Sequence, residues 1–234
     1  DWLEDARRRD FTINALYCDA DGTVHDPLGG REDLKARRVR FIGDAATRIA
    51  EDHLRILRFY RFAARFGHGD LDPASHAAVV AARQSLKSLS RERIGSEMRK
   101  LLAAPDPAPA VAAMAQAGVL ARVLPGSDPR ALAPLVHLES GLPPRWQRRL
   151  AALGGQEVEE RLRLSRADAK AVAGMLEHLE RALVAVDFLD PEAPKKLMPR
   201  LNALFNRAVP TEEEIHILRG VAKAMLQTAD KARR

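Results

Sequence analysis

The residue pattern changes near position 44, and this change constrains the fold more than any other feature. From Ala45 onward the chain is rich in Ala, Leu and Arg, with apolar residues at the three- and four-residue spacing of amphipathic helices. Before it, residues 11–18 roughly alternate between apolar and polar, and include β-branched and aromatic side chains. The pattern predicts a mainly α chain that starts with a small α/β or α+β unit over residues 1–43, too small to fold alone.

Turn signals divide this first unit. Asp21-Gly22 predicts a hairpin turn before a strand at 23–25, residues 26–30 predict a second turn, and 39–43 a last short strand. Asp19-Ala20-Asp21 has the spacing of two carboxylates on one strand face, which suits a metal ion. Because it runs straight into the turn, we interpret it as part of the hairpin.

Capping residues predict where helices begin in the rest of the chain. Asp caps a helix and Pro fits its first turn, so we expect helix starts at the Asp-Pro pairs 72–73, 106–107, 128–129 and 190–191. Thr211 with Glu214 forms a capping box. Breaks are predicted at 105–109, 125–126, 141–144 and 154–155. These signals describe a string of short helices in a compact array.

Composition narrows the classes of protein. The 234 residues are 46% hydrophobic, which argues against disorder, and no uncharged apolar run approaches the ~20 residues that span a bilayer. The net charge of +6 permits a polyanionic partner, while 5% aromatics argue against base-stacking platforms. The single cysteine, Cys18, excludes a disulfide framework and fits a reducing cytoplasm, and we expect a buried thiol there. The histidines, His53, His68, His76 and His216 among them, show no metal-ligand spacing.

Arginines recur along one predicted helix. Arg55, Arg58, Arg61 and Arg65 are three or four residues apart and share a face, opposite an apolar face that includes Leu57. Two interpretations are open: a solvated basic face, or a ridge that binds phosphate, whose oxygens suit guanidinium groups.

Asp52 and Arg55 lie one helical turn apart in the sequence, so both could point the same way. Cytosine and adenine present an amino donor beside a ring-nitrogen acceptor, whereas uracil and guanine present the reverse order. A carboxylate beside a guanidinium could therefore accept C or A and reject U or G. A surface ion pair between the two residues explains the same spacing.

A second basic cluster, Arg7-Arg8-Arg9, directly precedes the first predicted strand. It is either a solvated loop or a triphosphate contact made by Arg9, with Asn14 near a sugar.

Four segments together resemble consecutive motifs of the class II tRNA nucleotidyltransferase and poly(A) polymerase family. They are RRDFTINALY (8–17), DPLGGREDL (26–34), EDHLRILRFYRFAARFG (51–67) and SRERIGSEMRKLL (90–102). Residues 108–125 are similar to the next helical stretch of that family. The remainder resembles it only as a helical body and tail.

The resemblance implies a nucleotide-binding set. Its members are Arg9, Asp10, Asn14, Asp52, Arg55, Arg58 and Arg61. Asp52 and Arg55 would serve as the template for the incoming base. The other three arginines would hold the phosphates, and Asp10 with Asn14 would shape the ribose side. Gly29-Gly30 is either near a head–neck hinge or an ordinary turn.

The family also implies domains and an activity. Residues 1–43 would be the C-terminal part of a nucleotidyltransferase head, 44–104 a helical neck, 105–190 a body and 191–234 a tail. The activity would be addition of CCA to tRNA 3′ ends from CTP and ATP, with Mg²⁺ as cofactor and pyrophosphate released. Alternatives are a poly(A) polymerase of the same family and a non-catalytic RNA-binding helical module.

One departure from the family pattern qualifies this expectation. The family places a Gly-rich element and an Asp-x-Asp metal pair before the RRDFTINA motif, and only six residues precede Arg7 here. Because the chain also starts without Met, we expect a truncated product that lacks the Mg²⁺ ligands and is inactive alone. Lys195-Lys196 and 231–234 are either tRNA phosphate contacts or solvated ends. We expect a cytoplasmic protein; the sequence gives no oligomeric state.

Overall fold

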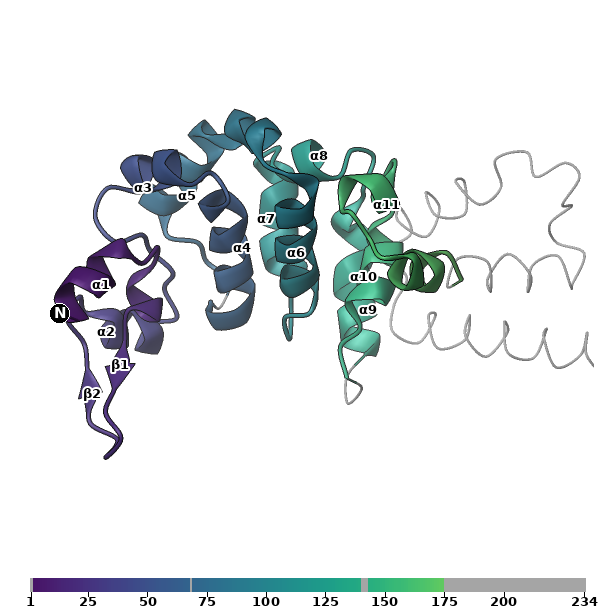
Figure 1. Ribbon diagram of the computed structural model, residues 1–234. Coiled ribbons are helices and arrows are strands. Elements are labelled where there is room, and N and C mark those ends of the chain that lie inside the picture. The colour runs from purple at the N-terminus through teal and green to yellow at the C-terminus, as the bar shows by residue number, and fades with distance from the viewer. Residues whose placement is uncertain (1, 68, 140–142, 175–234) are drawn as a thin grey trace, which may run out of the picture.

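The computed structural model describes residues 2–67, 69–139 and 143–174, and this part of the chain is mainly helical, as predicted. The first unit contains α1 (Trp2–Arg8), the 3₁₀ turn η1 (Thr12–Asn14), β1 (Tyr17–Cys18), β2 (Val24–His25) and α2 (Gly30–Lys35). There follow α3 (Ala45–Glu51), α4 (Arg55–Phe66), α5 (Pro73–Ala81), η2 (Arg83–Ser88), α6 (Arg91–Leu102), α7 (Ala108–Gln116), α8 (Leu120–Val123), η3 (Pro129–Ala131), α9 (Leu132–Leu138), α10 (Trp146–Leu153) and α11 (Val158–Arg161). The helices follow one another in an arc, with the hairpin projecting at the N-terminal end (Figure 1).

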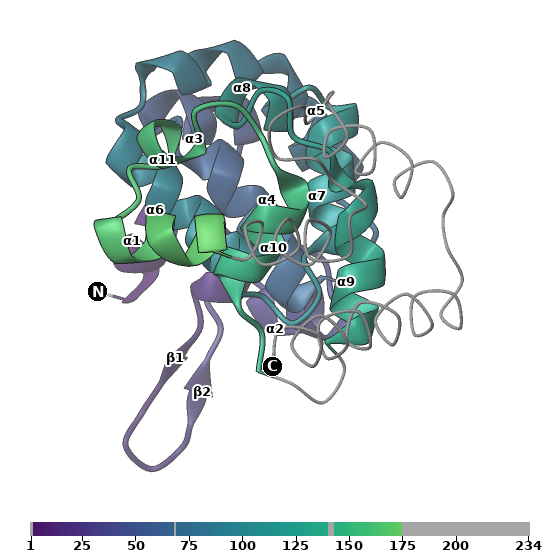
Figure 2. The same ribbon diagram turned by 90° about the vertical axis from the view of Figure 1, so that its right-hand side faces the viewer.

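The predicted hairpin is confirmed. β1 and β2 are antiparallel, with Tyr17 opposite His25, and Gly22 adopts a φ of 91° in the turn, which favours glycine. The two aspartates of the Asp-x-Asp segment serve the hairpin: Asp19 pairs with His25 at 2.6 Å, and Asp21 accepts the Thr23 backbone N–H at 2.9 Å. Figure 2 shows the hairpin extending away from the helices.

The strands predicted at 11–18 and 39–43 are largely wrong. Asn14 donates to the Asp10 carboxylate at 2.5 Å and accepts the Phe11 N–H at 3.3 Å, and these bonds curl the backbone into η1. Within these two segments, β-sheet pairing is found only at Tyr17–Cys18 and at one isolated bridge between Phe11 and Phe41. The basic cluster at 7–9 therefore ends α1, with Arg7 and Arg8 in its last turn, and does not directly precede a strand, because local side-chain bonds outcompete the alternating pattern.

The prediction of a buried thiol at Cys18 is also wrong, because Cys18 is exposed. It lies on the two-stranded hairpin, where no second layer of described residues covers its face. Its Sγ lies 3.3 Å from the Asp19 carbonyl oxygen.

The Asp-Pro signals are confirmed in the helical region with small shifts. Asp72 caps α5 by accepting the Ser75 N–H at 2.9 Å, as expected of an Asp before Pro73. Asp106 accepts the Ala108 N–H, so α7 begins one residue later than the pair suggests. The pair at 128–129 starts the short 3₁₀ turn η3. The signals at 190–191 and 211–214, and the lysines at 195–196 and 231, lie outside the described residues.

A continuous apolar core joins the first unit to the helices. The buried face of α4 packs against α6 and α7, and Phe59 on it is fully buried. Phe11 and Phe41 meet this face: their ring centroids are 4.9 Å apart, and Phe11 lies 5.0 Å from Phe62. Such tilted aromatic pairs are favourable beyond the area that they bury. The RRDFTIN segment is therefore anchored on α4.

A buried arginine fixes the far end of α6. Arg149 on α10 donates to the carbonyl oxygens of Leu102 at 2.7 Å and Ala104 at 2.5 Å, and pairs with the buried Glu139 at 2.7 Å. Carbonyls at a helix C-terminus have no partner within the helix, so this guanidinium supplies the missing donors. Within the described residues, no helix is long and apolar enough to cross a membrane.

Gly95 lets α6 approach the segment after α11, and this contact predicts a stability effect. A Cβ at Gly95 would lie 1.9 Å from the Leu162 carbonyl oxygen, so Gly95→Ala forces backbone apart. We expect a loss of about 1–3 kcal/mol in the free energy of unfolding, measured by urea denaturation.

The helical Gly174 is the matched control, because a Cβ there would meet none of the described residues within 4 Å. Gly174→Ala should stabilise by up to about 1 kcal/mol, since Ala loses less backbone entropy in a helix. Destabilisation by Gly174→Ala, or none by Gly95→Ala, would contradict this packing.

Candidate functional site

The arginines of α4 are not a solvated face. The side chains of Arg55, Arg58 and Arg61 are only 14%, 28% and 19% exposed, and each pairs with a carboxylate. The fourth, Arg65, is exposed and has its guanidinium over the Phe66 ring. The solvated-face interpretation is therefore wrong for three of the four positions. No contact among the described residues tests whether these arginines bind phosphate, so that interpretation stays a prediction.

Asp10, Asn14 and Arg58, which belong to the predicted set, form one network. The Arg58 guanidinium donates through Nε to the buried Asp10 carboxylate, which also accepts from Asn14. Burial raises the pKa of Asp10, but the hydrogen bond and charge of Arg58, with the bond from Asn14, outweigh it and hold this pKa below its usual value. The same contact raises the pKa of Arg58 despite its partial burial. The network ties the RRDFTIN segment to the middle of α4.

A second network joins that segment to the start of α4. Arg48 donates through Nη2 to the carbonyl oxygens of Arg8 at 2.6 Å and Arg9 at 2.5 Å. Arg55 donates to the Arg48 carbonyl oxygen at 2.6 Å and to the Glu51 carboxylate at 2.5 Å. Because Glu51 also pairs with Arg48, one carboxylate serves two guanidinium groups, and positive charge remains in excess here.

Asp52 does not pair with Arg55. It lies in an extended backbone (φ −152°, ψ 106°) between α3 and α4, so the expectation of two residues one turn apart on one helix is wrong. Its carboxylate pairs with Arg93 of α6, whose Nη2 lies 3.0 Å from Oδ1 and 2.8 Å from Oδ2. Burial raises the pKa of Asp52, but the bonds from Arg93 and the Leu54 N–H, with the charges of Arg93 and Arg55, lower it overall. The surface ion pair that would have explained the spacing is thus not formed.

Arg9 and Arg61 each lie beside a carboxylate that is outside the predicted set. Arg9 pairs with Asp5 at 2.9 Å, and its side chain is half-exposed. Arg61 Nε lies 2.6 Å from Oε2 of the buried Glu97, without hydrogen-bond alignment, and Lys100 is 3.2 Å from the other oxygen. The predicted residues therefore lie in the first unit, in the α3–α4 link and along α4, and two of their ion pairs reach α6.

Among the partners of the predicted residues, the following were absent from the predicted set: Arg48, Glu51, Arg93 and Glu97. Each lies within or next to the segments at 51–67 and 90–102 that carry the resemblance. Those segments are visibly rich in charged residues. The sequence held no signal that Arg93 would reach Asp52, because the two are 41 positions apart.

The described residues do not fit a Mg²⁺ site. Among them, no group of three His, Cys, Asp or Glu side chains could hold a metal ion. Asp19 and Asp21 are engaged with His25 and Thr23, as described above. No step of a reaction is therefore assigned to a metal held by these residues.

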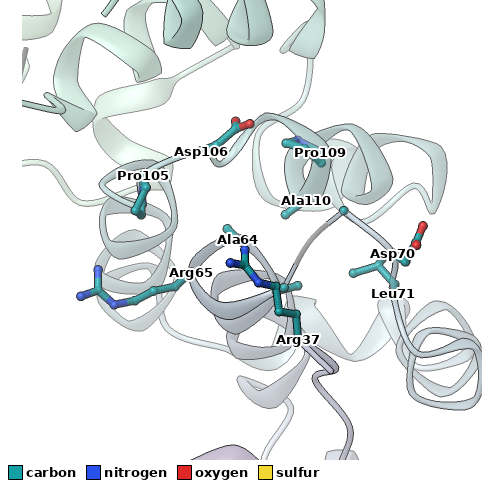
Figure 3. A pocket seen from close by; sticks show the side chains of 12 residues that line it. Arg37, Ala64, Arg65, Asp70, Leu71, Pro105, Asp106, Pro109 and Ala110 are labelled. Carbon is teal, nitrogen blue, oxygen red and sulfur yellow. The ribbon is translucent and has the colours of Figure 1, made fainter. Parts of the chain in front are cut away.

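A cavity of about 440 Å³ lies elsewhere, at the C-terminal end of α4. Arg37, Arg65, Asp70 and Asp106 line it, together with small residues such as Ala110 (Figure 3). None of the described residues that line it belongs to the predicted nucleotide-binding set. The candidate site is therefore the junction of η1, α3, α4 and α6 instead of this cavity.

Comparison with known families defines the class of protein. Residues 1–40 match the family described as "Poly A polymerase head domain", and residues 70–130 match "Probable RNA and SrmB- binding site of polymerase A". Residues 170–234 match "tRNA methyltransferase TrmJ, C-terminal domain", almost wholly outside the described residues. The first match contains the motif segments at 8–17 and 26–34, and the second contains the segment at 90–102.

Known proteins identify the family more closely. The chain is 47% identical over 104 residues to the human mitochondrial CCA tRNA nucleotidyltransferase 1, covering 44% of this chain and 24% of that protein. A Bacillus stearothermophilus CCA-adding enzyme solved with CTP is 33% identical, with a TM-score of 0.55, over 82% of this chain and 49% of that one. A Thermotoga maritima CCA-adding enzyme complexed with tRNA shares the fold at 22% identity, with a TM-score of 0.63, over 98% and 61%.

Over the matched segments the chain is similar to the CCA-adding enzyme and poly(A) polymerase family, which confirms the resemblance found in its motifs. It spans about a quarter of the length of the curated relatives that it matches.

Proposed function

We propose that this chain provides the base-reading and phosphate-binding part of a tRNA nucleotidyltransferase, which adds CCA to tRNA 3′ ends from CTP and ATP and releases pyrophosphate. The observation that carries the proposal is the junction of α3 and α4, where the Asp52 carboxylate and the Arg55 guanidinium are held by different partners. The Arg55 backbone N–H donates to the Asp52 carbonyl oxygen at 3.0 Å, so the two residues share one turn, and the charge of Arg55 contributes to the lowered pKa of Asp52. An acceptor and a donor that do not neutralise each other suit the pairing edge of cytosine or adenine.

The remaining predicted residues have roles in this proposal. Arg9, Arg58 and Arg61 would neutralise the triphosphate, and Asp10 with Asn14 would border the ribose. The RNA 3′ oxygen would attack the α-phosphorus while the bond to the pyrophosphate oxygen breaks, and guanidinium groups would stabilise the charge on the leaving group. Mg²⁺ is the proposed cofactor of the complete reaction, and the described residues of this chain are given no part in binding it.

The division of the chain is proposed on the same basis. Residues 1–43 would belong to the catalytic head and 44–104 to the neck, and residues 105–190 and 191–234 would bind tRNA through its backbone and shape. A cytoplasmic location is proposed with this activity.

Arg55→Ala tests the proposal in the full-length protein, with any sequence that flanks residues 1–234. Removing the donor should lower the preference for CTP over UTP by roughly 10- to 100-fold, because the base edge loses its partner. Incorporation of each nucleotide into tRNA that lacks its 3′ end measures the preference.

Arg161→Ala is the matched control. Arg161 also pairs with a glutamate four residues earlier, Glu157 at 2.9 Å, but lies on α11. It should leave the preference unchanged. Unaltered CTP preference in Arg55→Ala would overturn the assignment of the base-reading residue.

Poly(A) synthesis is a second candidate, favoured by the family match over residues 1–40. The same assay separates the two, because CCA addition gives a short product of fixed length and poly(A) synthesis a long tail. A non-catalytic RNA-binding module would show no preference for CTP and ATP over UTP and GTP in equilibrium binding.

A further inference from the structure

Asp52 depends on other elements for its orientation. It lies in the extended link between α3 and α4, so no helix of its own fixes the side chain. The Leu54 N–H donates to Oδ1 at 3.1 Å, and Arg93 Nη2 lies within hydrogen-bond distance of both carboxylate oxygens. These three contacts are the hydrogen bonds that the carboxylate makes among the described residues.

The contacts leave a particular acceptor position open. A carboxylate has about four lone-pair sites, two on each oxygen. Oδ1 receives the Leu54 N–H and Arg93, whereas Oδ2 receives Arg93 alone. One site therefore remains on Oδ2, and the side chain is partly exposed, so a ligand can reach it.

Arg93 is itself well placed to hold this geometry. It lies in the first turn of α6, which Ser90 caps by accepting the Arg93 N–H at 3.3 Å. α6 packs along α4 and is fixed at its other end by Arg149. A guanidinium anchored on this helix limits rotation of the carboxylate, since turning it would break contacts to both oxygens.

We propose that Arg93 is a positioning residue that sets nucleotide specificity by fixing the Asp52 carboxylate, so that Oδ2 presents its free lone pair to the exocyclic amino group of cytosine or adenine. The proposal rests on the proposed function of the Asp52–Arg55 site. Uracil and guanine would place a carbonyl oxygen at the same point, where two acceptors repel each other.

Equilibrium binding of CTP and UTP to the full-length protein, including any flanking sequence, tests this role. Arg93→Ala should reduce the ratio of CTP to UTP affinity roughly tenfold, because CTP loses a fixed acceptor that UTP never uses. Arg93→Lys, which keeps the charge and a donor, should restore part of the ratio. Far-UV circular dichroism and thermal unfolding verify that each variant folds.

Arg91→Ala is the matched control, because Arg91 lies in the same turn of α6 and its side chain is 49% exposed, as that of Arg93 is. It pairs with Glu160 and should leave the ratio unchanged.

The outcomes separate this inference from the proposed function. An unchanged ratio in Arg93→Ala, or an equal loss of affinity for both nucleotides, would overturn the role of Arg93 and leave the proposed function standing. Absence of any CTP preference in the unsubstituted protein would overturn the proposed function and this inference with it. A lowered ratio that Arg93→Lys partly restores would support both.

Discussion

Arg149→Met should destabilise the protein by about 3–5 kcal/mol, the cost of breaking a buried ion pair from one side. The side chain is buried, and its guanidinium satisfies Glu139 and the carbonyl oxygens of Leu102, Ala104 and Pro105. Methionine fills similar volume but supplies no donor, so the three carbonyl oxygens and Oε2 of Glu139 lose these buried hydrogen bonds, while Arg148 still pairs with Oε1. Urea denaturation followed by circular dichroism measures the loss.

Arg148→Met is the control for this prediction. Arg148 pairs with the same glutamate at 2.5 Å, but it is partly exposed, and the hydrogen bonds to the end of α6 come from Arg149. Arg148→Met should lower the free energy of unfolding by less than about 1 kcal/mol. Equal effects from the two substitutions would show that the carbonyl contacts of Arg149 contribute little.

Asp10→Asn should cost about 3 kcal/mol or more, because Arg58 would lose the carboxylate that compensates its half-buried charge. Asn14 would also lose its charged acceptor. Since Asp10 joins η1 to α4, unfolding of the variant should be seen both in thermal denaturation and in faster amide exchange over residues 10–14. Asp5→Asn, which removes an exposed ion pair with Arg9, should change stability far less.

The contribution of Asp10 should also depend on pH. Its folded-state pKa is depressed below the ordinary value of 3.8, so the stabilisation is complete well above pH 3.8 and is lost as pH falls below it toward the folded-state pKa. The difference in stability between the protein and Asp10→Asn should therefore shrink in acid below that value. A difference that stayed constant through this range would mean that the carboxylate charge is not what stabilises the junction.

The sequence predicted the helical region well because its signals are local. The apolar spacing of α4 and the cap at Asp72 depend on residues within one turn, so each could be identified without tertiary contacts. Strand prediction failed at 11–18 because Asn14 and Asp10 form side-chain bonds that override alternation. The prediction of a buried thiol at Cys18 failed because the burial of a strand residue depends on whether other elements cover that face of the strand, which no local sequence pattern encodes.

The sequence predicted several residues of the candidate site, but it did not predict which residues contact one another. Asp10, Asn14 and Arg58 do form one network, although the sequence alone could not pair residues 48 positions apart. Asp52 and Arg55 were expected side by side on a helix, yet each is held by another element. Arg93 reaches Asp52 because α6 lies beside the α3–α4 junction, whereas Glu51 is only four residues from Arg55.

The contact of Arg48 with the backbone of Arg8 and Arg9 has a consequence for sequence change over time. The acceptors are carbonyl oxygens, which every amino acid carries, so replacing the side chains at 8 and 9 leaves the joint intact. An insertion or deletion in 10–47 that shifts this backbone would remove the acceptors from reach. This junction can thus tolerate drift in residue identity at those two positions while constraining the length of the chain that closes it.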